Sequence, residues 1–115
     1  MRDNAAFKVL TGAQLAQLER DGHWSGSADD ARDGYIHLST AAQLTATVDK
    51  HYADGDDLHV AEVDLEALGD AIRWEASRGG QEFPHLYGEL PLDAVVAYSP
   101  LERDGHGQVK LPVTG

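Results

Sequence analysis

The amino-acid sequence predicts an α+β fold in which antiparallel sheets carry most of the chain and two helices lie in the N-terminal half. Five or six short segments have the alternating or continuous apolar character of strands. Two segments in the first half combine a helical apolar stripe with a capping pattern. Strands and helices do not alternate regularly, so a doubly wound parallel sheet is not expected.

The first strand is expected at residues 5–11, "AAFKVLT", and a helix begins directly after it. Thr11 and Gln14 fit a capping box, and Gly22 is the expected end of that helix. Residues 22–34 are polar and contain glycine, so we predict a loop of about a dozen residues. Loops of that length in compact domains often carry function.

The next strand is expected at residues 34–39, "GYIHLS", where Tyr35, His37 and Ser39 share one face. Thr40 then opens a second capping box, "TAAQ". The apolar residues that follow recur every four positions, which predicts the second helix.

The second half of the chain is predicted to be mostly strands, at residues 58–64, 71–77, 83–90 and 93–99. The first of these, "LHVAEVD", is nearly continuously apolar, which is typical of a central strand. Asp64 can cap a short turn at residues 65–69, and "RGGQ" (78–81) is expected to turn.

Length and charge limit the classes of function. The 115 residues suit one domain spanning residues 1–115. A net charge of −11 repels phosphate backbones and anionic lipids, so general nucleic-acid or membrane binding is not expected. The chain has no cysteine for disulfides or thiolate chemistry. No stretch resembles a signal peptide or a membrane span, so we expect a cytoplasmic protein.

Two predicted strands each carry a histidine and a tyrosine on one face: Tyr35 with His37, and His85 with Tyr87. Imidazole titrates near neutral pH and can donate or accept a proton, so the two pairs could form the polar floor of a site. The proline before His85 and the glycine after Tyr87 suit an edge or bulged strand that lines a cleft. The alternative is that each histidine is packed structurally, with a nitrogen bonded to a carbonyl.

Further candidates have two interpretations each. Ser39 and Thr40 stand where a strand passes into a helix, where backbone N–H groups and hydroxyls can bind an anion; alternatively they only cap the helix. Trp24, in the predicted loop, is either an aromatic lid or a plug that holds the loop in place.

The segment "RWEASRGG" (73–80) adds a cluster of polar and aromatic candidates. Glu75 could hydrogen-bond a ribose or stabilise a developing cation, and Trp74 could stack on a flat ring. Arg73 or Arg78 could hold a phosphate. The alternative is a core tryptophan beside a hydrated surface. No metal site is expected, because the histidines lack ligand spacing, and no nucleophile elbow supports a serine hydrolase.

The segments "DGYIHLST" and "RWEASRGGQEFPHLYGELPLDAVV" together resemble the family catalogued as domain of unknown function 952 (DUF952), over nearly the whole chain up to Val96. This family carries no agreed activity. A remoter similarity, in "HLS" and in the order of elements, is to RNA 2′-phosphotransferases and rifampin ADP-ribosyltransferases. That similarity implies an ADP-ribosyltransferase-like fold, a split and strongly bent pair of antiparallel sheets that holds NAD or an ADP-ribosylated intermediate.

The similarity places His37 and Ser39 at the ligand and implies a transferase dependent on NAD or ADP-ribose. The ligand would be NAD or a related ADP-ribosyl or phosphorylated nucleotide. Glu75 would stabilise an oxocarbenium-like centre, and His85 would act as general acid/base or as a second phosphate donor. Trp74 or Tyr87 would stack on the base or nicotinamide. Two alternatives stay open: a non-catalytic module that binds a small ligand, and a structural domain whose histidines are simply packed.

Overall fold

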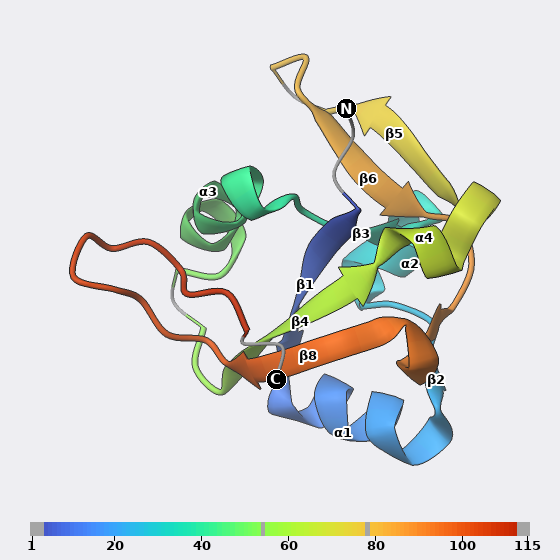
Figure 1. Ribbon diagram of the computed structural model, residues 1–115, viewed down its shortest axis with the longest axis horizontal. Coiled ribbons are helices and arrows are strands. Elements are labelled where there is room, and N and C mark those ends of the chain that lie inside the picture. Colours follow the sequence, from blue (N-terminus) through green and yellow to red (C-terminus); the bar gives the residue numbers. More distant parts are fainter. Residues whose placement is uncertain (1–3, 54, 78, 113–115) are drawn as a thin grey trace.

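The computed structural model describes residues 4–53, 55–77 and 79–112. Its strands form two three-stranded antiparallel sheets, in the orders β1-β4-β8 and β3-β6-β5, and a two-stranded ribbon, β2-β7 (Figure 1). The predicted α+β class with antiparallel sheets is therefore confirmed.

The strands are β1 (Ala5–Thr11), β2 (His23–Trp24), β3 (Ile36–His37), β4 (Leu58–Asp64), β5 (Ile72–Ala76), β6 (Glu82–Leu86), β7 (Leu90–Pro91) and β8 (Val95–Pro100). The helices are α1 (Gly12–Asp21), α2 (Ala28–Asp33), α3 (Ala41–His51) and α4 (Leu65–Leu68), with 3-10 turns η1 (Gly69–Ala71) and η2 (Leu92–Ala94). No helix in the described ranges is long and apolar enough to cross a membrane.

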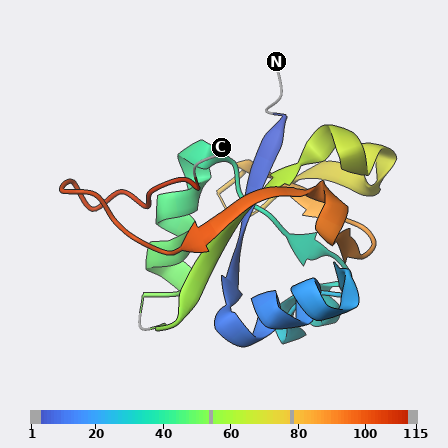
Figure 2. The same cartoon turned by 60° about the horizontal axis from the view of Figure 1, so that its bottom comes forward.

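The first sheet is covered on both faces, with α1 and α3 on opposite sides of β1 and β4 (Figure 2). Successive residues of β1 point to opposite faces, so Leu10 packs with α1 while Phe7 and Val9 pack with α3. Burying one such side chain contributes about 1.5–3 kcal/mol. The two-sided burial explains the apolar run in this strand, and β4 is central as predicted.

The two predicted capping boxes start the expected helices. The hydroxyl of Thr11 accepts from the N–H of Gln14, and the Gln14 side chain accepts from the N–H of Thr11. Thr40 and Gln43 repeat this arrangement at α3. These reciprocal bonds satisfy backbone donors that a helix start leaves without partners.

The prediction of a loop over 22–34 is wrong, and so is the placement of only two helices in the N-terminal half. The segment contains β2, which pairs with β7, and α2. A third capping box, between Ser27 and Asp30, starts this short helix. Four of its six residues are charged and the other two are alanines, so it has no stripe of large apolar residues by which hydrophobic periodicity could reveal it.

The strand predicted at 34–39 is shorter than expected, because β3 has only two residues. Ser39 leaves the second sheet and pairs with Phe7 of β1 through two backbone hydrogen bonds, of 2.7 and 2.9 Å. This segment therefore joins the two sheets.

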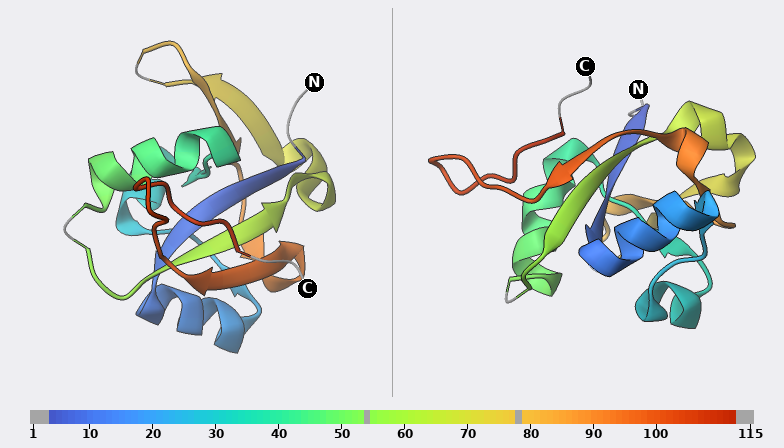
Figure 3. Two further views of the ribbon diagram at one scale, coloured as in Figure 1. Left: turned by 60° about the vertical axis from the view of Figure 1, so that its left-hand side comes forward. Right: turned by 90° about the horizontal axis from the view of Figure 1, so that it is seen from below.

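The strand predicted at 83–90 is also interrupted: β6 ends at Leu86, and the chain resumes pairing only at β7. The strand predicted at 93–99 begins later, after η2. The β5–β6 hairpin rises above β3, while residues 101–112 form an arm beside α3 (Figures 1 and 3). The arm is held there by Arg103–Asp49 and by the Val109 N–H on Thr45.

Candidate functional site

The two histidines singled out from the sequence lie next to each other. Strands β3 and β6 are antiparallel, and His37 stands opposite His85 in their register. The ring centroids are 5.6 Å apart with the rings nearly perpendicular. The ring of Tyr35 stacks on His85, with centroids 4.0 Å apart, and lies 4.7 Å from His37. The pairing of β3 with β6 thus brings together residues nearly fifty positions apart in the chain.

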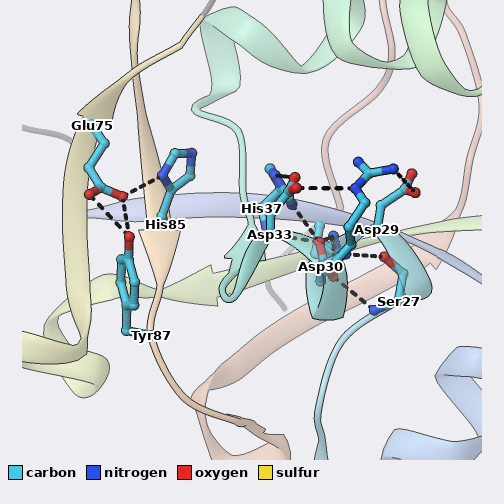
Figure 4. Close-up of polar contacts among 10 residues, drawn as sticks. Ser27, Asp29, Asp30, Asp33, His37, Glu75, His85 and Tyr87 are labelled. Carbon is cyan, nitrogen blue, oxygen red and sulfur yellow. Dashed lines mark hydrogen bonds and ion pairs between the residues drawn. The ribbon is translucent and has the colours of Figure 1, made fainter.

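His85 is held by a carboxylate on the neighbouring strand (Figure 4). Its Nδ1 lies 2.8 Å from Oε1 of Glu75, and the Tyr87 hydroxyl donates to both oxygens of that carboxylate, at 2.8 and 3.1 Å. Hydrogen bonds from His85 and then Tyr87 lower the pKa of Glu75, and the bond to Glu75 raises the pKa of Tyr87. Nε2 of His85 has no hydrogen-bond partner among the described residues. An imidazole held in this way can serve as a general acid/base, because the carboxylate at Nδ1 fixes its tautomer.

A second carboxylate, Asp30, organises the residues around His37. Asp30 is buried, with 2% of its side chain exposed, and it contacts the equally buried Lys8 with both oxygens, at 3.0 and 3.2 Å. It also accepts from the N–H of Ser27, from the N–H of His37 and, at 2.6 Å, from Nδ1 of His37. One side chain therefore ties β1, α2 and β3 together.

Burial and the neighbouring charges shift the pKa values of Asp30 and Lys8 in opposite directions. Burial alone would raise the pKa of Asp30, but the hydrogen bond from His37, the charge of Lys8 and the N–H of Ser27 together hold it well below its usual range. Burial lowers the pKa of Lys8, an effect that Asp30 partly offsets. Asp30 is thus a permanent anion in the folded protein at neutral pH.

His37 has a carboxylate at each ring nitrogen. Besides the contact of Nδ1 with Asp30, its Nε2 lies 3.0 Å from Oδ2 of Asp33. Both contacts are hydrogen bonds only when both nitrogens carry a proton, which is the imidazolium form. The side chain is 38% exposed. Asp30 and Asp33 therefore fix the orientation of the His37 ring through its two nitrogens.

A cleft of about 610 Å³ opens beside both histidines. Its volume lies in the range of small-molecule sites. Its walls come from β1, α2, β3, α3 and β6, and α3 contributes one face of the helix. The residues on that face are Gln43, Ala46, Thr47, Lys50 and His51. Phe83 and Tyr52 add aromatic surface.

Most of the predicted site residues gather around this cleft. His37, His85 and Ser39 line it, and the hydroxyl of Ser39 is bonded to that of Thr47 at 2.9 Å. Four more of the predicted residues lie around the two histidines without lining the cleft. They are Tyr35, Glu75, Tyr87 and Arg73, whose guanidinium carbon lies 4.7 Å from the centre of the Tyr87 ring.

Three predicted ligand-binding residues lie elsewhere. Thr40 caps α3 and does not line the cleft. Trp24 is 3% exposed in the core, where its ring lies 5.7 Å from Nζ of Lys8, so it plugs the fold and is not a lid. Trp74 packs against the same core. Arg78 lies outside the described residues.

Sequence reasoning missed Lys8, Arg32, Asp30 and Asp33, all of which line the cleft. A lysine inside the continuous apolar run "AAFKVLT" was one available sign, because a buried lysine requires a partner. The Ser27–Asp30 spacing was the other, since it fits a capping box with an acidic third residue. Within the described ranges, no group of three or more histidine and carboxylate side chains is arranged to hold a metal ion.

The family model described as "Protein of unknown function (DUF952)" matches residues 9–98. The crystal structure of protein CC0527 from Caulobacter crescentus is similar to this chain, with a TM-score of 0.84 and 37% identity over 92% of this chain and 93% of that one. The solution NMR structure of CC0527 gives a TM-score of 0.79 at 37% identity, over 93% and 91% of the two chains. No curated protein matches the sequence at a significant level.

Proposed function

The chain belongs to the DUF952 family of proteins of unknown function, and we propose that it is a small enzyme that binds NAD or a related ADP-ribosyl or phosphorylated nucleotide in the cleft beside His37 and His85. The observation that carries the proposal is the Glu75–His85 pair. Glu75 fixes Nδ1 of His85 at 2.8 Å and leaves Nε2 without a partner in the described part of the chain.

In the proposed mechanism, Nε2 of His85 takes a proton from a hydroxyl group or a water and later returns it. Glu75 keeps the imidazole in the tautomer that has a free Nε2 and stabilises the imidazolium that forms. A positioned acid/base of this kind contributes a factor of about 10² to 10⁴ in rate. The ring of His37, whose centroid lies 5.6 Å from that of His85, would favour negative charge on the bound substrate when both of its nitrogens carry a proton.

Three features support a nucleotide as the ligand. The volume of about 610 Å³ suits a molecule of that size. Phe83 and Tyr52 offer rings on which a base could stack. Lys50 and His51, both exposed, place an ammonium and an imidazole on the same cleft as possible donors to a phosphate.

The proposal extends to an ADP-ribosyltransferase-like arrangement. Two separate antiparallel sheets, joined where Phe7 pairs with Ser39, support it, because such folds hold the nucleotide between two split sheets. The cleft is lined from both of these sheets.

Calorimetric titration with NAD, ADP-ribose and a 2′-phosphorylated nucleotide, followed by mass analysis of products, tests the proposal. His85→Ala should lower product formation at least about 10²-fold while changing affinity only a few-fold. His106→Ala, at an exposed histidine of the C-terminal arm, is the matched control and should leave both unchanged. The nucleotide assignment fails if the wild-type protein binds none of the three.

One observation favours a second function, a binding module without turnover. Both nitrogens of His37 are already engaged by carboxylates, and only 5% of the His85 side chain is exposed. Saturable binding with no product over many hours, in wild type and in His85→Ala alike, would assign this second function.

A further inference from the structure

We infer that Nε2 of His37 and the guanidinium of Arg32 form a subsite for a phosphate group, and that the carboxylate of Asp33 occupies it when no ligand is bound. The inference rests on the proposed function, because the subsite would hold a phosphate of the nucleotide. It goes further in naming the groups that bind the anion and the side chain that must give way.

The carboxylate of Asp33 is held as a bound anion would be. Its Oδ2 lies 3.0 Å from Nε2 of His37 and its Oδ1 lies 3.2 Å from Nε of Arg32. Two nitrogen donors from different elements thus converge on the two oxygens of one small anion, and Figure 4 shows Asp33 beside His37. Charge-assisted donors placed in this way recognise phosphate as well as carboxylate.

The donor on His37 stays in place when Asp33 leaves. Its other nitrogen is bonded at 2.6 Å to Asp30, which is buried and is also held by Lys8. The ring therefore cannot turn to follow Asp33, and its Nε2 proton continues to face the same position. Desolvated partners of this kind fix orientation in a way that exposed ion pairs do not.

Asp33, in contrast, is easily displaced. It is the last residue of the six-residue helix α2, and its side chain is 33% exposed. Arg32 is 69% exposed and also reaches Asp29, at 3.3 Å. Ion pairs in contact with water are weak and screened by salt, so a phosphate with greater charge can replace the carboxylate.

If Asp33 competes for the subsite, removing its charge should tighten anion binding. Titration with inorganic phosphate, followed by the NMR signal of His37 Nε2, measures this. Asp33→Asn should bind phosphate about fivefold more tightly than wild type, the effect expected for loss of one exposed competing ion pair. Adding Arg32→Gln should cancel the gain, because one of the two donors is then lost.

Asp70→Asn is the matched control. Asp70 is exposed in η1, does not line the cleft and has no ion pair with His37 or Arg32 among the described residues. The control removes the same charge and should change phosphate affinity less than about twofold. An equal gain in phosphate affinity in both variants would show that only the overall charge of the protein matters, and the subsite would be wrong. No gain in Asp33→Asn would also overturn the subsite.

The two proposals fail separately. If the wild-type protein binds no nucleotide but Asp33→Asn still binds phosphate at His37 more tightly, the subsite stands and the nucleotide assignment falls. If the nucleotide binds and reacts through His85 but Asp33→Asn leaves phosphate affinity unchanged, the subsite is wrong and the enzyme proposal stands. Backbone amide spectra of each variant establish that the fold is kept.

Discussion

At the scale of single residues, Asp30 constrains the site more than either histidine does. It accepts from Lys8 on β1, from Ser27 at the start of α2 and from His37 on β3. Burying an ion pair has a large desolvation cost, so Lys8–Asp30 adds less stability than its short distances suggest. The pair instead fixes one arrangement of β1, α2 and β3, because losing either charge would leave the other one buried without a partner.

Asp30→Asn should lower the free energy of unfolding by about 3–5 kcal/mol, because it leaves the Lys8 ammonium buried without an anion. Urea unfolding followed by far-UV circular dichroism measures the loss. Asp29→Asn, whose side chain is 75% exposed, should change stability by less than about 0.5 kcal/mol.

Adding Lys8→Met to Asp30→Asn should recover part of that loss, since the double variant buries no unpaired charge. A double variant that is less stable than Asp30→Asn alone would show that Lys8 contributes by its contacts, such as the one to Trp24, and not through its charge.

Stability should fall in acid with a slope that Asp30 helps to set. Its pKa in the folded state lies below the unfolded value of about 3.9. Below about pH 4 the unfolded chain therefore binds more protons, and the free energy of unfolding falls as the pH falls. The pKa values of Glu75 and Asp33 are also lowered and act in the same direction.

Urea unfolding between pH 2.5 and 6 should therefore show a shallower acid slope for Asp30→Asn than for the wild type. Asp56→Asn, at an exposed carboxylate, should keep the wild-type slope. Equal slopes in Asp30→Asn and the wild type would mean that Asp30 is not an anion bound by His37 and Lys8.

Glu75→Gln should alter the chemistry of His85 without unfolding the protein. The Glu75 side chain is 38% exposed, so the loss of its charge leaves no buried cation. Nitrogen chemical shifts of His85 should show that the proton is no longer confined to Nδ1, and turnover of any substrate found should drop about 10²-fold. Glu66→Gln, at an exposed residue of α4, should show neither effect, and unchanged His85 shifts in Glu75→Gln would contradict the proposed pair.

The sequence could predict only part of this site. Tyr35 with His37 and His85 with Tyr87 follow from period-two alternation, a local pattern. Lys8 and Asp30 are 22 positions apart, and their pairing depends on how α2 docks under β1. No local pattern contains that information, so a lysine in an apolar run could raise the question of a partner but could not name it.

At the scale of elements, α2 is the least self-sufficient part of the site. Helices this short are not stable in water on their own. Its start depends on the Ser27–Asp30 capping box, and its end on Gly34, which has φ 88° and whose N–H bonds to the carbonyl of Asp30. Because tertiary contacts and caps, and not periodicity, make this helix, the sequence pattern predicted a loop instead.

Gly34→Ala should destabilise the protein by about 1 kcal/mol, because an L-residue at this left-handed position is strained. Since Asp33 immediately precedes it, phosphate affinity at His37 should change as well. Gly105→Ala, at a glycine with open space and no positive φ, should stay within about 0.5 kcal/mol of wild type. A loss of the same size in both variants would point to chain entropy, and Gly34→Asn should be better tolerated than alanine.

At the scale of the whole molecule, the class of fold and the central place of β4 could be predicted, but the division into two sheets could not. The apolar runs of β1 and β4 indicate burial on two faces, which the packing of α1 and α3 explains. The division depends on the segment from β3 to Ser39, which changes partner from β6 to β1 within three residues. Pairing register between distant strands is not encoded in any one of them.

The chain has a net charge of −11, and the cleft is lined by three basic side chains, Lys8, Arg32 and Lys50, by three carboxylates, Asp29, Asp30 and Asp33, and by histidines. An anionic nucleotide approaching from solution therefore meets a repulsive long-range field before it reaches the donor groups of the cleft. Added salt screens exposed charges beyond a Debye length of about 10 Å at 0.1 M, so it should weaken the repulsion more than the contacts inside the cleft.

The association rate constant for an anionic ligand should consequently rise, on the order of two- to threefold, as ionic strength increases from about 25 to 200 mM. This is opposite to the behaviour of electrostatically steered partners, whose association slows with salt. Stopped-flow measurements with ADP-ribose test it, and uncharged adenosine, if it binds, should show no salt dependence. A rate that falls with salt would mean that Lys50 at the cleft dominates the field that an incoming ligand meets. In that case Lys50→Gln should remove the dependence, and the acidity of the remaining surface would have no part in selecting the ligand.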